Sequence, residues 1–130
     1  MSASWPRRVV GVVAGLLVVA GCGGGGDSGP QAYTEPTGPA KATITIDGGN
    51  YYFKPDTPSA KSEIVNLELH GVRGTHTLVF DDGKVPGFQL EVVAGETASK
   101  KIDLKPGKYV FYCDIIGHRA QGMEGTLTIT

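Results

Sequence analysis

The residues best suited to chemistry lie near the C-terminus, where the chain reads Cys113-x4-His118-x4-Met123; a further histidine, His76, lies upstream. One thiolate, two imidazoles and one thioether form the soft ligand set of a mononuclear copper site that transfers electrons. In such a site two histidines and a cysteine lie in a trigonal plane, and methionine adds a long, weak axial bond. Residues 113 to 123 supply three of these four donors. One tight loop can therefore surround an ion, with the fourth donor coming from a neighbouring strand.

Each of these residues also has an ordinary structural interpretation. A free cysteine is usually a small buried hydrophobe, and a methionine often fills a gap in a core. The spacing of Cys113, His118 and Met123 favours ligation over these alternatives. His70 competes with His76 as the upstream ligand. The alternation of its strand sends His70 outward, so we expect it to be a solvated residue at a sheet edge.

Short strands separated by turns rich in glycine and proline occupy the chain from residue 41 onward. The expected strands cover residues 42–46, 51–53, 64–69, 75–80, 89–93, 97–104, 108–113 and 126–130. No segment there sustains a helical period over three turns, so the pattern predicts an all-β Greek-key sandwich or barrel of about eight strands. In strand 108–113, Phe111 and Cys113 share one face, which places the thiol at the apolar end of the core.

The N-terminal residues are typical of an exported lipoprotein. Arg7 and Arg8 precede a short apolar stretch, and small residues lead to Cys22, which resembles a bacterial lipobox cysteine. The apolar stretch is too short to favour a spanning anchor. We therefore expect a lipoprotein signal peptide over residues 1–21, a lipidated Cys22 with a flexible Gly/Pro-rich tether over residues 22–40, and one folded domain over residues 41–130. The protein would then be anchored by lipid on the outer, periplasmic side of the bacterial cell membrane.

Composition excludes several classes of function. The chain has 12 basic and 13 acidic residues, and removal of Arg7 and Arg8 with the signal leaves 10 against 13, a net charge of −3. This balance argues against nucleic-acid binding. With Cys22 acylated, Cys113 has no partner for an intramolecular disulfide, and a lone thiol outside the cytoplasm is oxidised unless it is buried or coordinated. The chain contains three histidines, too few for a second, catalytic copper centre, so we expect no enzyme activity.

Together these features resemble the cupredoxins, the small blue copper proteins, over most of residues 41–130. The resemblance rests on segments 53–55, 76–80, 104–109 and 123–127. The spacing from cysteine to histidine is longer than in plastocyanin and closer to rusticyanin-like, auracyanin-like and sulfocyanin-like members. The resemblance implies that His76, Cys113 and His118 are equatorial ligands of one type 1 copper ion and that Met123 is the axial ligand.

Two positions depart from the cupredoxin pattern. Thr77 stands where cupredoxins usually have an asparagine whose side chain ties the two ligand loops together, and its hydroxyl can make part of that bond. Asp114 follows the cysteine directly, in a loop that lacks the proline of several relatives. An acidic group beside the thiolate would favour the oxidised, more positive copper.

The resemblance implies one-electron transfer between a protein donor and a protein acceptor by a monomeric, membrane-anchored protein that binds no nucleic acid. His118, close to the surface, would be the natural exit for the electron, and Tyr112 is a second candidate by analogy with plastocyanin. The alternative is an extracytoplasmic copper chaperone or scavenger that uses the same donors. A metal-free adhesive sandwich would leave the spacing of the loop unexplained.

Overall fold

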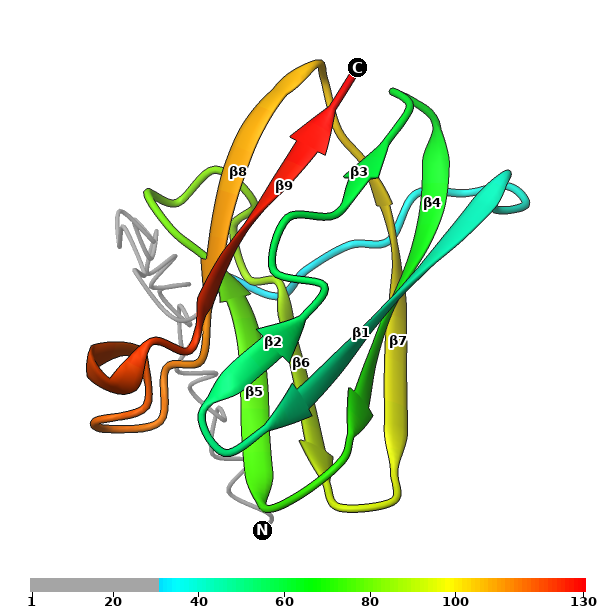
Figure 1. The fold of residues 1–130 in the computed structure, drawn as a ribbon. Coiled ribbons are helices and arrows are strands. Elements are labelled where there is room, and N and C mark those ends of the chain that lie inside the picture. Colours follow the sequence, from blue (N-terminus) through cyan, green and yellow to red (C-terminus); the bar gives the residue numbers. More distant parts are fainter. Residues whose placement is uncertain (1–30) are drawn as a thin grey trace, which may run out of the picture.

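The computed structural model describes residues 31–130; Cys22 and the predicted signal peptide lie outside this part of the chain. Two β-sheets pack face to face (Figure 1). The elements are β1 (Ala42–Gly49), β2 (Tyr52–Lys54), β3 (Ser59–Ala60), β4 (Ile64–Gly71), β5 (Thr75–Phe80), β6 (Gln89–Val93), β7 (Thr97–Asp103), β8 (Gly107–Tyr112), the 3-10 helix η1 (Arg119–Gln121) and β9 (Glu124–Ile129). Within residues 31–130, no helix is long and apolar enough to cross a membrane.

Both sheets mix parallel and antiparallel pairs. The first has the strand order β2-β1-β4-β7, and the second has the order β3-β9-β8-β5-β6. β1 runs parallel to β4, and β3 runs parallel to β9, whereas the other neighbours are antiparallel. The predicted all-β sandwich is confirmed.

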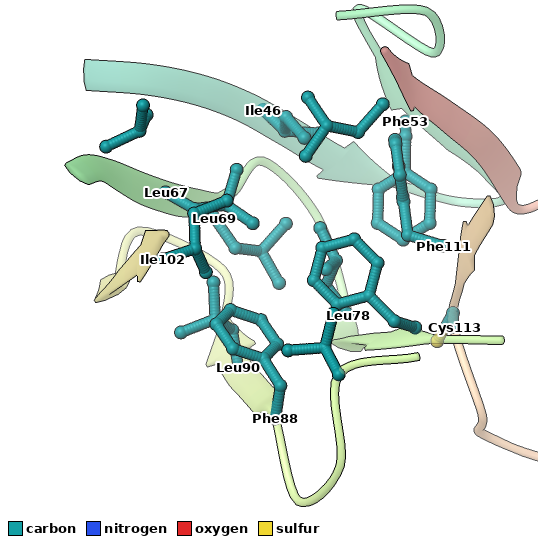
Figure 2. Close-up of a cluster of buried hydrophobic side chains, with 14 of the residues drawn as sticks. Ile46, Phe53, Leu67, Leu69, Leu78, Phe88, Leu90, Ile102, Phe111 and Cys113 are labelled. Atoms are coloured by element: carbon teal, nitrogen blue, oxygen red, sulfur yellow. The ribbon is translucent and has the colours of Figure 1, made fainter. Parts of the chain in front are cut away.

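Alternating apolar residues build the core between the sheets. In β4 every second residue from Val65 is buried, as expected for a strand with one face toward the core. Figure 2 shows the resulting cluster, with Cys113 at one end of it beside Phe111. The ring of Phe111 packs edge-on against that of Phe53, with centroids 5.3 Å apart. The thiol therefore lies where the core meets the loops, as strand parity predicted.

Several boundaries differ from the sequence prediction because pairing overrides local turn signals. β1 continues beyond residue 46, since its parallel register with β4 extends to the pair Gly48 and Gly71. β3 was not predicted, because two residues carry no periodic pattern. His70 is half exposed, as expected, and its Nδ1 lies 3.0 Å from Asp47 Oδ1. It does not lie on an edge strand, because β4 is paired on both sides.

The predicted tether includes residues 31–40, but in the structure this segment packs against the folded domain. These ten residues are here called the strap. The Tyr33 ring packs perpendicular to that of Phe88 with centroids 5.0 Å apart, and its hydroxyl donates to the carbonyl of Lys101 at 2.8 Å. The carboxylate of Glu35 accepts the backbone N–H of Lys101 at 2.9 Å. β7 is the outer strand of its sheet, and the strap supplies hydrogen-bond partners for the backbone N–H and carbonyl of Lys101 on this edge.

Candidate metal centre

The four candidate ligands lie at strand ends on one side of the sandwich. His76 is the second residue of β5, Cys113 follows β8 directly, His118 precedes η1, and Met123 precedes β9. The loop from residue 113 to residue 123 projects beyond the paired strands β8 and β9 (Figure 1). Its two ends are joined, because the N–H of Cys113 donates to the carbonyl of Met123 at 3.1 Å. The N–H of Met123 in turn donates to the carbonyl of His118 at 3.2 Å.

Three of these side chains converge on one point. One nitrogen from each of His76 and His118 and the sulfur of Cys113 all lie within 4.8 Å of one another. The sulfur is 3.4 Å from Nδ1 of His118. His76 and Cys113 are fully buried, whereas His118 is partly exposed. The described part of the chain thus places a thiol and two imidazoles at the boundary between core and solvent.

The orientation of His76 leaves one nitrogen free for a metal. Its Nε2 is 2.6 Å from the carbonyl of Arg73, which can only accept, so Nε2 carries the proton. Nδ1 is therefore a lone-pair donor, and it is buried without a hydrogen-bond partner. Buried polar atoms are seldom left unpaired, whereas a metal-binding imidazole normally donates its other N–H to a carbonyl or carboxylate. Burial, with a smaller effect of the neighbouring His118, lowers the pKa of His76 and keeps the ring neutral.

Met123 extends to the same place from the other side of the loop. It is fully buried, and a Cβ atom added at Gly48 would lie 3.6 Å from the Met123 methyl carbon and 3.7 Å from Cβ of His76. Gly48 thus lies directly beside both the thioether and His76. The four side chains are arranged as a type 1 copper site.

Thr77 connects the two segments that carry ligands. Its backbone N–H donates to the sulfur of Cys113 at 3.4 Å. Its hydroxyl oxygen accepts the backbone N–H of Asp114 at 3.0 Å and lies 2.5 Å from the Asp114 carboxylate. The hydroxyl therefore makes a tie of the kind that cupredoxins usually make with asparagine. Sequence reasoning singled out both residues but did not pair them.

Arg119 fixes the far side of the loop, and nothing in the sequence identified it. Its guanidinium donates to Asp81 at 2.7 Å and to Glu124 at 2.6 Å. The same group lies over the Tyr112 ring, 4.0 Å from the centroid. The hydrogen bond from Arg119 lowers the pKa of Asp81. Because Asp81 is 38 residues away in sequence, no local pattern could have revealed this contact.

A family model described as copper binding proteins, plastocyanin/azurin family, matches residues 40–130. The chain belongs to this family. The cupredoxin fold and copper as the cofactor, both predicted from the sequence, are thereby confirmed. The donor set itself fits the metal, because thiolate, thioether and imidazole suit copper, and the buried Nδ1 of His76 has no hydrogen-bond partner.

Solved structures share the fold of this cupredoxin at low sequence identity. Auracyanin B is 21% identical with a TM-score of 0.59, covering 78% of this chain and 96% of that chain. Auracyanin from the photosynthetic bacterium Roseiflexus castenholzii is 18% identical with a TM-score of 0.58, covering 71% and 99%. Auracyanin A from Chloroflexus aurantiacus, a "blue" copper protein, is 14% identical with a TM-score of 0.55, covering 68% and 98%. Comparison with curated proteins found no match.

Proposed function

We propose that this cupredoxin carries single electrons between protein partners and is a carrier rather than an enzyme. In this proposal His76 Nδ1, Cys113 Sγ and His118 Nδ1 are the equatorial ligands of one copper ion, and Met123 is the axial ligand. The observation that carries the proposal is the convergence of the three equatorial donors within 4.8 Å, one of them a buried imidazole nitrogen without a partner. Bound copper supplies the change between Cu(I) and Cu(II).

The chain supports this role by holding its donors in nearly fixed positions. His76 lies on a paired strand and is fixed through its hydrogen bond to Arg73. Cys113 and Met123 are joined through the backbone across the base of the loop. The two oxidation states of copper prefer different geometries, so donors that cannot move far hold one arrangement acceptable to both. This lowers the structural change that each electron transfer requires.

The surface beside the ligands supports a protein partner and an exit through His118. In residues 31–130, all of the exposed large hydrophobic side chains belong to segments that adjoin the site. They are Tyr51, Tyr52, Val72, Val93 and Ile116. The Tyr51 ring packs edge-on against that of His118 with centroids 4.8 Å apart, and Ile116 is 98% exposed. Exposed apolar side chains near the ligands therefore support a protein partner at this end of the molecule.

Tyr112 is a poorer exit in this protein than the analogy with plastocyanin implies. Its ring is half-buried, and the guanidinium of Arg119 covers it at 4.0 Å from the centroid. A partner approaching this ring would meet Arg119 first. We therefore assign the exit to His118, which is partly exposed and has the fully exposed Ile116 two residues before it in the loop.

We also propose that Cys22 is acylated and holds the protein on the outer side of the bacterial cell membrane. Support comes from the sequence, in which a basic segment, an apolar stretch and small residues precede Cys22. Replacing Cys22 by alanine should move the protein from the membrane fraction to the soluble fraction. Membrane association that is unchanged in Cys22→Ala would contradict the proposal.

The test of electron carriage is the optical spectrum of the protein after addition of one equivalent of Cu(II). We expect intense visible absorption from the thiolate–copper bond and a reversible one-electron wave. Cys113→Ser should abolish the absorption. His70→Ala is the matched control and should retain it, because His70 is paired with Asp47 on the outer face of the other sheet. A colourless protein that holds only Cu(I) would refute electron carriage and favour the copper chaperone or scavenger.

A further inference from the structure

The hydroxyl group of Thr77 lies against three different groups of the ligand loop. The Thr77 side chain is 4% exposed, whereas its partner Asp114 lies at the surface of the loop. Its oxygen is 3.0 Å from the backbone nitrogen of Asp114, 2.5 Å from the Asp114 carboxylate and 3.6 Å from the sulfur of Cys113. The hydroxyl therefore has a choice of acceptors, and one of them is the thiolate ligand.

The distances decide where the hydroxyl proton lies. A hydroxyl has one proton to donate, and the backbone N–H of Asp114 already occupies a lone pair of the oxygen. Hydrogen bonds from a hydroxyl to a carboxylate are short, about 2.5–2.7 Å, and roughly twice as strong as neutral ones. The separation of 2.5 Å from Asp114 matches such a bond, whereas the separation of 3.6 Å from sulfur indicates a weak contact. The proton is thus directed to the carboxylate and away from Cys113.

We propose that Thr77 and Asp114 form a reciprocal latch between β5 and the ligand loop, and that the Asp114 carboxylate withholds the Thr77 hydroxyl from the Cys113 sulfur. Asp114 is then a positioning residue that acts on the metal through Thr77. In the described part of the chain the sulfur keeps the backbone N–H of Thr77 at 3.4 Å as its other donor. The latch itself does not depend on the proposed function; its effect on copper rests on that function.

Two consequences for bound copper have the same sign. Hydrogen bonds to the cysteine sulfur tune the reduction potential of a type 1 site, because they draw electron density from the thiolate. Withholding the hydroxyl therefore lowers the potential. The nearby negative carboxylate also stabilises the more positive Cu(II), which lowers it further. Removal of Asp114 should raise the potential by both routes.

A double-mutant cycle separates the two routes. Asp114→Ala removes the charge and frees the hydroxyl to turn toward sulfur. In a Thr77→Val background no hydroxyl exists, so the same change removes only the charge, while the backbone N–H to sulfur remains. We expect Asp114→Ala to raise the midpoint potential and shift the thiolate–copper absorption band more in the wild-type background than in the valine background. Thr77→Ser should restore the larger shift. Equal shifts in the two backgrounds would overturn the withheld-hydroxyl proposal.

Hydrogen exchange in the copper-free protein tests the latch on its own. Thr77→Val should speed exchange of the Asp114 amide about tenfold, as expected for the loss of one hydrogen bond. Thr45→Val is the matched control, since Thr45 also donates to a carboxylate, that of Glu68, but on the other sheet. It should leave Asp114 unchanged. Unaltered exchange at Asp114 in Thr77→Val overturns the latch even if the copper protein is blue. Absence of blue colour in the wild-type protein refutes electron carriage. In that case the exchange rate of the Asp114 amide in the copper-free protein still shows whether the latch exists.

Discussion

Replacement of Phe111 by alanine tests whether the site rests on the core as the structure indicates. The Phe111 ring is 1% exposed and packs against Phe53. It also fills the space beside Gly125, where an added Cβ would overlap the ring. Truncation leaves a cavity that neighbouring strands cannot easily close, because β8 is paired with both β5 and β9. Removal of a fully buried phenylalanine ring in this setting costs about 3–5 kcal/mol.

That loss is large relative to the free energy of unfolding of a small domain, which is typically about 5–15 kcal/mol. We therefore expect Phe111→Ala to shift the denaturation midpoint of the copper-free protein strongly, followed by circular dichroism. Phe111→Leu keeps more of the side-chain volume and should cost less than Phe111→Ala, leaving the copper absorption intact. Val110→Ala, on the outer face of the same strand, is the control. Equal effects of Phe111→Ala and Val110→Ala would refute the placement of this ring in the core.

Three further predictions concern contacts outside the core. Arg119→Gln should speed exchange of the Met123 amide, because the loop loses its ties to Asp81 and Glu124; unchanged exchange would show that these ion pairs do not restrain the loop. Arg119 lowers the pKa of Asp81 below its ordinary 3.8, so this carboxylate stabilises the fold above that pH, and the contribution is lost as pH falls through the lower pKa of the folded state. Asp81→Asn should accordingly lower the urea denaturation midpoint at about pH 6 but not at about pH 2. Equal midpoints for mutant and wild type at about pH 6 would contradict this prediction. Tyr33→Ala should increase proteolysis within the strap without altering the copper spectrum; a strap that stays protected would show that Tyr33 does not hold it.

The sequence predicted those parts of the fold that have a local period. β5 and β6 were predicted with the bounds that the structure has, because their alternation and flanking turns are strong. The spacing of Cys113, His118 and Met123, with His76 upstream, was sufficient to indicate copper, because a thiolate, two imidazoles and a thioether form the ligand set of a type 1 site. The ligand assignment of Met123 remains a prediction, supported by its position beside Gly48.

What the sequence could not predict depends on contacts between distant residues. The strap was read as tether because its composition is that of a linker, and only the outer strand β7 gives it hydrogen-bond partners. The pairing of Thr77 with Asp114 joins residues 37 positions apart. The contact of Arg119 with Asp81 likewise joins residues 38 positions apart. No single-sequence pattern encodes such proximity.

The parallel pairing of β3 with β9 has a consequence for how the molecule forms. Ser59 pairs with Thr128 and Ala60 with Ile129, so β3 gains its neighbouring strand only from residues about 70 positions further along the sequence. β9 also pairs with β8 and closes the loop that carries His118 and Met123. Folds dominated by such distant pairings form slowly, on the order of milliseconds to seconds. The metal-binding end is therefore completed only once β9 is in place, and loss of β9 would leave a partial sheet unable to hold an ion.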